Sequence, residues 1–158
     1  MKYILDTNIF RKLLEHFPKK GKSFERIWKV IDEKIDNGVL LSVDECFNEI
    51  ENHYSKDNEN FKWISSRKKM FLTPTNEESL IIRDLFRKTK MQESIHTKNI
   101  LKNRPAADVY IAAKAKAISA TVVTSEGYKP HSAQLPNICE ELGVKCISYD
   151  DFMEKIEE

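Results

Sequence analysis

Acidic residues follow two apolar segments of this sequence, at positions where a carboxylate would be costly to bury. Asp6 comes directly after "YIL" at 3–5, and Glu126 comes two residues after the β-branched run "TVVT" at 121–124. Carboxylate oxygens are the ligands that Mg²⁺ and Mn²⁺ prefer. The four histidines show no H-x-x-x-H spacing and the three cysteines form no C-x-x-C pair, so zinc is not indicated. The two acids instead indicate a site for a hard divalent cation.

A third acid, Asp108, lies in a segment that reads as a buried helix. From Pro105 to about Ile118 the chain is apolar on almost every face apart from Lys114 and Lys116, a pattern typical of a helix packed inside a protein. Asp108 falls in its first turn and faces inward. The helix dipole favours a carboxylate there by about 0.3–1 kcal/mol, which is less than an unpaired buried charge costs. We expect either a cation beside Asp108 or hydrogen bonds from the backbone amides of the helix start.

The helix expected after Ser42 carries two further acids. Its apolar stripe consists of Val43, Phe47, Ile50 and Tyr54. Glu49 lies at the border of this stripe and is the stronger site candidate, although an exposed helical glutamate would show the same pattern. The run Ser42-Val-Asp-Glu45 matches a capping box. Glu45 is therefore expected to cap the helix or to stand behind the metal ligands.

Strand and helix signals alternate along the chain. Strands are expected at 2–5, 39–41, 71–72, 121–124 and 144–148. Helices are expected at 8–17, 24–37 (capped by Ser23), 42–54, 58–69, 76–88, 105–118, 135–142 and 149–157, with a polar loop at 89–104. This alternation predicts an α/β fold, a central parallel sheet covered by helices on both faces. The length predicts a single domain spanning 1–158.

Ligands of such sheets bind beyond the carboxyl ends of the strands. Asp6 follows one of these ends directly, and Glu126 follows another. We therefore expect a site formed by Asp6, Glu49, Asp108 and Glu126. Thr7 and Ser125 offer hydroxyl groups beside these acids, and Asn8 either caps the following helix or orients Asp6. His53, one turn after Glu49, is a weaker candidate for lining the site.

Composition sets the broad class of the protein. Hydrophobic residues make up 41% and charged residues 32% of the chain, as is ordinary for a soluble globular protein. No apolar run approaches the roughly 20 residues of a membrane helix, and the N-terminus does not resemble a signal peptide. We expect a cytoplasmic protein whose cysteines are reduced thiols.

Charge is distributed unevenly although the net charge is only +1. Residues 62–104 contain eleven Lys or Arg and four acids, whereas residues 121–158 contain three Lys and eight acids. A basic middle segment suits a polyanionic partner, although a solvated helix surface has the same composition. Arg83, Arg87, Lys88 and Arg104 are the residues that we expect to contact RNA phosphates. Trp28 and Trp63 are expected in the core rather than stacked on bases.

Several stretches resemble the PIN-domain nucleases, in the order and at the distances of that family. They are "ILDTN", the glutamate of "FNEI", "ADVYIAAKA" and "TVVTSE". The C-terminal part is similar to a prokaryotic subgroup related to VapC-type toxins. The resemblance covers most of the chain and is weakest between about 56 and 100.

The resemblance implies a three-layer α/β/α sandwich and Mg²⁺- or Mn²⁺-dependent cleavage of RNA. Asp6, Glu49 and Asp108 match the first three acids of the family. The fourth is usually an aspartate in "T-x-D", for which Glu126 is the nearest match. The resemblance also implies a toxin that pairs with an antitoxin protein, and a homodimer.

Two alternatives remain open from the sequence. One is a non-catalytic PIN-fold module that binds RNA or acts as a scaffold. The other is a metal-dependent phosphatase on a different α/β fold, although its usual acid-x-acid start is missing because position 8 is Asn8.

Overall fold

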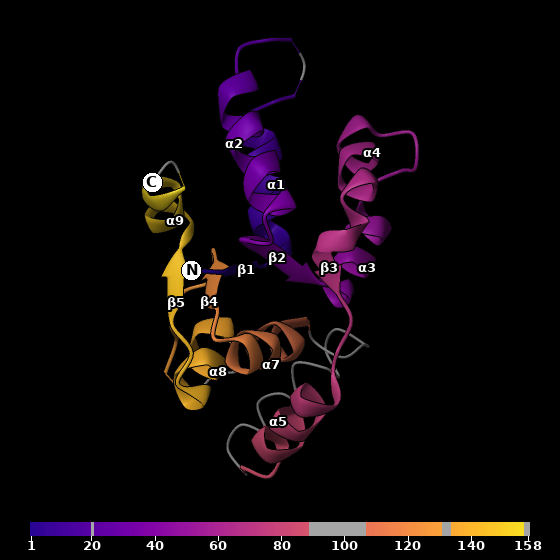
Figure 1. Ribbon diagram of the computed structural model, residues 1–158. Coiled ribbons are helices and arrows are strands. Elements are labelled where there is room, and N and C mark those ends of the chain that lie inside the picture. The colour runs from indigo at the N-terminus through magenta and orange to yellow at the C-terminus, as the bar shows by residue number, and fades with distance from the viewer. Residues whose placement is uncertain (20, 89–106, 131–133, 157–158) are drawn as a thin grey trace.

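The computed structural model describes residues 1–19, 21–88, 107–130 and 134–156 (Figure 1). The strands are β1 (Tyr3–Leu5), β2 (Leu40–Val43), β3 (Phe71–Leu72), β4 (Thr121–Thr124) and β5 (Cys146–Ser148). The helices are α1 (Thr7–His16), α2 (Glu25–Asp36), α3 (Asp44–His53), α4 (Glu59–Ser66), the short 3₁₀ helix η1 (Lys68–Met70), α5 (Asn76–Phe86), α7 (Ala107–Ile118), α8 (Leu135–Leu142) and α9 (Tyr149–Lys155). The predictions for Arg104, Pro105 and the loop at 89–104 lie outside the described residues.

All strand pairs of the sheet are parallel, and the strand order is β3-β2-β1-β4-β5. Tyr3 pairs with Leu40 on one side and with Thr121 on the other. The apolar run of β1 is thus central in the sheet, as a strand buried on both faces requires. The carboxyl ends of β1 and β4 lie side by side, because Leu5 pairs with Val123.

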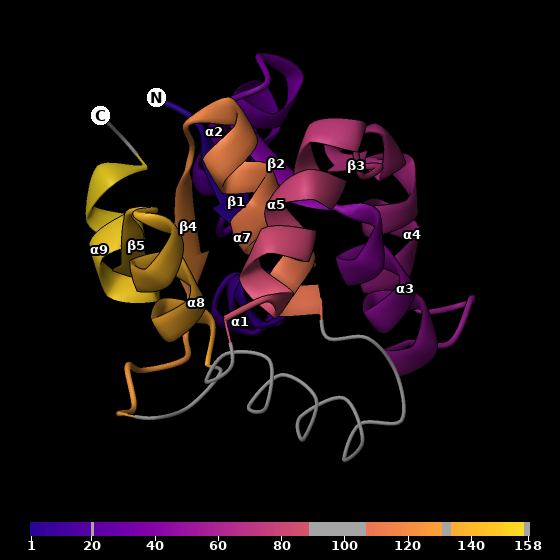
Figure 2. The same cartoon turned by 90° about the horizontal axis from the view of Figure 1, so that it is seen from below.

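Helices cover both faces of the sheet, which confirms the predicted three-layer α/β/α architecture. In Figure 1, α1, α2 and α9 lie above the sheet, whereas α5, α7 and α8 lie below it. Figure 2 shows α7 between α8 and α5 on the lower face. α3 and α4 lie beside β3 in both views. No helix of the described residues is long and apolar enough to cross a membrane.

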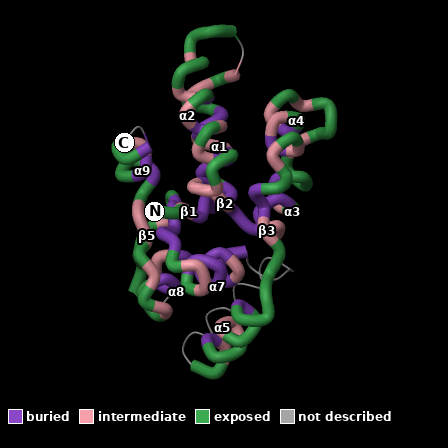
Figure 3. Tube along the Cα trace, in the orientation of Figure 1, coloured by how far each residue is buried: buried purple, intermediate pink, exposed green. Residues whose placement is uncertain are grey.

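α7 is buried along most of its length, as its all-round apolar pattern predicts (Figure 3). Ala112, Ala113 and Ala115 are almost completely inaccessible, and these small side chains let the helix approach the sheet closely. Val109 and Ile111 add to the same core. Asp108, in the first turn of α7, is therefore part of a helix that packs into the core.

Several predicted caps are wrong. α2 follows Phe24 without a side-chain cap, so Ser23 does not cap it. α3 begins after Val43, again without a side-chain cap, and Ser42 instead donates its hydroxyl to the carbonyl of Leu5 at 2.7 Å. A buried carbonyl acceptor therefore removes Ser42 from the predicted capping box, and Glu45 loses the structural role that the box gave it.

A buried ion pair joins α5 to α7, and the sequence pattern does not indicate it. Lys114 Nζ lies 2.8 Å from Glu78 Oε2 and donates to the carbonyl of Thr73 at 2.8 Å. Both charged side chains are almost fully buried. Glu78 also accepts from the backbone amide of Thr75 at 3.0 Å in a true capping box. Every charge of this cluster thus has a partner, which is the condition for burying it.

Candidate active site

Asp6 is buried at the carboxyl end of β1 and is the N-cap of α1. Its Oδ1 accepts the backbone amide of Thr7 at 2.7 Å, and its Oδ2 accepts the hydroxyl of Thr124 at 2.9 Å. The backbone amide of Asp6 donates to the carbonyl of Val123 at 3.1 Å, which continues the pairing of β1 with β4. Both carboxylate oxygens are therefore fixed in direction by the ends of two neighbouring strands.

The charge of Asp6 is unfavourable in this position. Burial and, to a smaller extent, the nearby charges of Asp108 and Glu126 raise the pKa of Asp6 from 3.8 to about 7. The hydrogen bonds from Thr124 and Thr7 oppose this shift only in part. The fold thus brings the carboxylates of Asp108 and Glu126 near enough to disfavour the charge of Asp6, and a cation would relieve that repulsion.

Asp108 and Glu49 come from two helices, α7 and α3, and each interacts with a residue at the carboxyl end of β1. Asp108 is buried in the first turn of α7, as its position in the apolar helix predicts. Glu49 is half-buried on α3, and its Oε2 accepts the hydroxyl of Thr7 at 2.7 Å. Thr7 therefore bridges Asp6, through its amide, to Glu49, through its hydroxyl.

The charge of Glu126 acts on Asp6, but the carboxylate of Glu126 forms a hydrogen bond outside the acidic cluster. Glu126 Oε2 accepts the backbone amide of Leu135, the first residue of α8, at 2.8 Å. Its own amide donates to the hydroxyl of Thr124 at 3.1 Å. Thr124 is thus the hydroxyl that connects Asp6 to the Glu126 segment, whereas the sequence points to Ser125, which is exposed. Its place as the last residue of the run "TVVT" is the only local signal for Thr124, and that signal does not suffice without the register of β4 against β1.

The remaining predicted residues lie around this centre. Glu45 is half-buried, and its pKa is raised by burial and then by the charges of Asp44 and Glu49. Asn8 is exposed within α1, and Asp6 caps that helix in its place. His53 is exposed at the end of α3, about a helical turn beyond Glu49.

The donor atoms fit a hard divalent cation. Within the described residues, no three His, Cys, Asp or Glu side chains are arranged to hold a metal ion by themselves. Mg²⁺ does not require such a cage, because it is usually held by one or two carboxylates while waters and substrate phosphates complete its coordination. Asp6 and Asp108 supply two buried carboxylates, which matches that requirement.

Three of the basic residues proposed from the sequence, Arg83, Arg87 and Lys88, are exposed on or next to the end of α5, and each lies near an acid. Arg87 Nη1 is 3.6 Å and Arg83 Nε 3.9 Å from Asp84 Oδ1. Lys88 Nζ is 2.6 Å from Glu141 Oε1 on α8. Exposed ion pairs of this kind contribute little stability, so these cations can exchange an acid for a phosphate at small cost.

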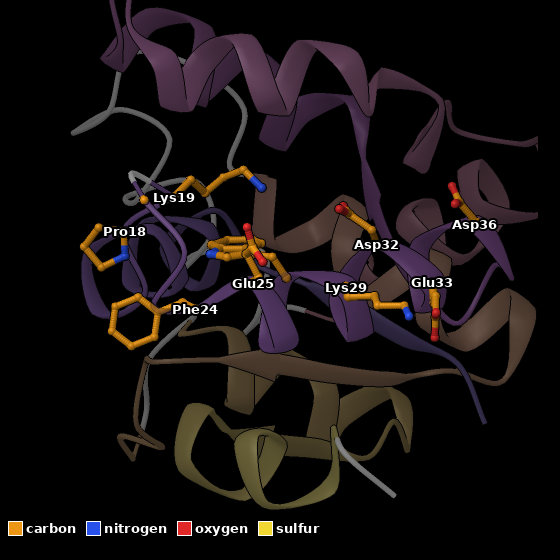
Figure 4. A pocket seen from close by; sticks show the side chains of 10 residues that line it. Pro18, Lys19, Phe24, Glu25, Lys29, Asp32, Glu33 and Asp36 are labelled. Atoms are coloured by element: carbon orange, nitrogen blue, oxygen red, sulfur yellow. The ribbon is translucent and has the colours of Figure 1, made fainter.

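A cavity of about 420 Å³ lies along α2, and its lining contains none of Asp6, Asp108 and Glu126 (Figure 4). Its lining includes Lys19 and Trp28. Lys19 Nζ lies 4.3 Å from the centre of the Trp28 ring and 5.0 Å from that of Trp63. The two indoles pack edge to face at 4.9 Å, with Trp28 buried and Trp63 half-buried. Trp28 therefore belongs to the core, as predicted.

Comparisons with known proteins identify the family of this chain and bear on its fold. The family model described as "Domain of unknown function (DUF4411)" matches residues 3–158. The sequence has no match among curated proteins. The structure is similar to that of VapBC2 from Rickettsia felis bound to a DNA fragment from their promoter, with a TM-score of 0.53, 15% identity, and coverage of 94% of this chain and 98% of that chain.

The structure is also similar to that of FitAB bound to IR36 DNA fragment. The TM-score is 0.50 at 16% identity, and the match covers 93% of this chain and 94% of that chain. At such identities the likeness concerns the fold alone, and it confirms the α/β fold that the resemblance to PIN-domain proteins implied.

Proposed function

This chain belongs to the family described as Domain of unknown function (DUF4411), and we propose that it is a metal-dependent endoribonuclease. One observation carries the proposal: Asp6 is buried and oriented by two hydrogen bonds while the charges of Asp108 and Glu126 oppose its ionisation. A protein retains such an unfavourable carboxylate where a cation or a reaction uses it.

We assign roles from the contacts of each side chain. Asp6 and Asp108 would hold the ion, Mg²⁺ or Mn²⁺. When bound, the ion lowers the pKa of its water and stabilises charge on the scissile phosphate. Glu49, held by the Thr7 hydroxyl, would orient the attacking water or add a ligand. Glu126, whose Oε2 is held by the Leu135 amide, would act through water or as a direct ligand through its other oxygen.

Attack by water predicts products with 5′-phosphate and 3′-hydroxyl ends. Attack by the ribose 2′-hydroxyl would instead leave 2′,3′-cyclic phosphates, and finding these would contradict the roles assigned to Asp6 and Asp108. RNA is proposed as the substrate because of the PIN-like fold and because Arg83, Arg87 and Lys88 form an exposed basic group on and next to α5.

The proposed biological role is that of a toxin paired with an antitoxin protein. Support comes from the resemblance to VapC-type toxins and from the structural similarity to VapBC2 over almost the whole chain. A homodimer and a cytoplasmic location belong to the same proposal, as does a single domain over 1–158.

A non-catalytic PIN-fold module that binds RNA is the second candidate. The observation that favours it is the bond between Glu126 and the Leu135 amide, since this carboxylate already binds the start of α8. In a catalytic site, Asp6 and Asp108 would have to suffice as metal ligands, or Glu126 would have to contribute while its Oε2 stays bound to the Leu135 amide.

Cleavage of an end-labelled RNA pool separates the two candidates. We expect cutting with Mn²⁺ or Mg²⁺, none with excess EDTA, and a loss of more than about a hundredfold in Asp108→Asn, since even residues behind metal ligands cost about 10–100-fold. Asp57→Asn, at an exposed acid between α3 and α4, is the matched control and should cut normally. Equal cutting by Asp108→Asn would exclude the proposed site.

A further inference from the structure

Tyr128 presents a large aromatic ring to solvent in the loop after β4. Its exposed fraction is 59%, and the other exposed large apolar residues of the described chain are Met1 and Leu80. The loop leaves the sheet beside α8 in both views (Figures 1 and 2). Single exposed apolar residues are common on proteins, so exposure alone assigns no role to the ring. The location of Tyr128 and the hydrogen bonds that fix its loop give the reason to assign one.

The location places Tyr128 next to the acidic site. Tyr128 is two residues beyond Glu126, whose backbone amide donates to the Thr124 hydroxyl at 3.1 Å. That hydroxyl in turn donates to Asp6 Oδ2 at 2.9 Å, and residues two apart are separated by at most about 7 Å along an extended chain. A phosphate held by the ion proposed at Asp6 and Asp108 would therefore bring its flanking nucleotides within reach of the Tyr128 ring.

The loop that carries Tyr128 is fixed on both sides of it. On one side, Glu126 Oε2 accepts the Leu135 amide at 2.8 Å. On the other, buried Asn137 donates its Nδ2 to the Lys129 carbonyl at 2.7 Å and accepts the Lys129 amide on Oδ1 at 3.2 Å. All three bonds attach the loop to the start of α8. The backbone of Tyr128 is thus held in place before any ligand arrives, which reduces the entropy lost on binding.

Stacking suits this location better than charge. The proposed ion binds the scissile phosphate, but the carboxylates around it still repel the neighbouring phosphates of RNA. The adjacent nucleotide is therefore better held by an uncharged group that binds its base. An exposed aromatic ring is such a group, since every base has a flat face. We propose that the Tyr128 ring stacks on an unpaired base of single-stranded RNA next to the phosphate at the acidic site, an inference that rests on the proposed function.

The test compares Tyr128→Ala with Tyr128→Phe and with Leu80→Ala, a matched control at a similarly exposed residue on α5. The probe is a short single-stranded RNA of mixed sequence carrying fluorescein, bound with Ca²⁺ in place of Mg²⁺ and followed by anisotropy. We expect Tyr128→Ala to weaken Kd about tenfold, which corresponds to one stacked base. Tyr128→Phe and Leu80→Ala should bind like the wild type, and thermal melting should be the same for all variants.

A second readout reports stacking directly. The fluorescence of 2-aminopurine in the RNA falls when the base stacks, so quenching should occur with the wild type and Tyr128→Phe and disappear with Tyr128→Ala. Duplex RNA, whose bases are already stacked, should bind Tyr128→Ala and the wild type equally. Unchanged quenching in Tyr128→Ala, or an equal weakening with duplex RNA, would overturn the proposal.

The two proposals fail separately in these experiments. If the wild type cuts RNA and Tyr128→Ala binds RNA as tightly as the wild type does, the nuclease proposal stands and the stacking proposal is wrong. If RNA binding depends on Tyr128 but the protein does not cut RNA with Mn²⁺ or Mg²⁺, the stacking proposal stands and the non-catalytic module is favoured.

Discussion

At the residue scale, Asp6 makes the stability of the metal-free protein depend on pH. Its pKa is about 7 in the native state, against 3.8 for an unperturbed aspartate. A raised native pKa means that the folded protein binds the proton more tightly than the unfolded chain does. The contribution of Asp6 is therefore fully stabilising below about pH 4 and is lost as the pH rises through about 7. The free energy of unfolding of the wild type is expected to fall by about 4 kcal/mol between these two pH values through Asp6 alone.

Asp6→Asn tests this prediction. Asparagine also caps helices, so it retains the bond from the Thr7 amide while removing the charge. We expect the variant to exceed the wild type in free energy of unfolding by several kcal/mol at pH 8 in EDTA, with a gap that narrows steadily toward pH 4. Urea unfolding across this range measures it. A gap that does not change with pH would show that Asp6 ionises normally.

The same residues show what the sequence can and cannot predict about a site. Burial of Asp6 and Asp108 follows from the apolar segments around them. The role of Thr124 does not, because the hydroxyl that meets Asp6 depends on the register of β4 against β1. The expected capping role of Glu45 fails for a similar reason: the carbonyl of Leu5 takes the Ser42 hydroxyl, and no local pattern contains that interaction.

At the element scale, periodicity locates the strands and helices well, whereas the burial of charged side chains depends on tertiary partners. β4 and α8 have the predicted bounds, and Gly143 ends α8 with a φ of 71°, a conformation that glycine adopts without strain. The sequence places Lys114 near the far end of an otherwise apolar helix, with no sign of a partner. Its burial depends on Glu78, which lies on α5 and is distant in sequence.

The link between α5 and α7 gives a stability prediction. Lys114→Met leaves the buried Glu78 carboxylate without its cation and should destabilise the protein by about 3–5 kcal/mol. Adding Glu78→Gln removes that charge and retains a side chain able to form a capping box with Thr75, so the double variant should recover much of the loss. Lys116→Met, on the same helix but exposed, is the control for removing a lysine. Chemical unfolding of these variants and of Glu78→Gln alone measures the differences, and additive effects would refute the coupling.

At the scale of the whole molecule, the charges that would hold RNA and the acids that would cut it come from different parts of the chain. Arg83, Arg87 and Lys88 lie on or next to α5, on the face that also carries α7. α2 lies on the opposite face (Figure 1). If RNA crosses the α5 side to reach Asp108, only cations on that side contribute to binding.

Salt dependence distinguishes this arrangement from a general attraction of the protein for polyanions. Replacing Arg83, Arg87 and Lys88 by glutamine should weaken RNA binding and reduce the slope of log K against log salt, by about 0.7 for each phosphate of a single strand that is no longer neutralised. Arg26→Gln with Lys29→Gln, two exposed cations on α2, should leave the slope unchanged. Anisotropy titrations at increasing KCl measure both slopes. Equal slopes for the α5 variant and the α2 variant would contradict a path over α5, because that path requires the cations on the α5 face to contribute more to RNA binding than those on the α2 face.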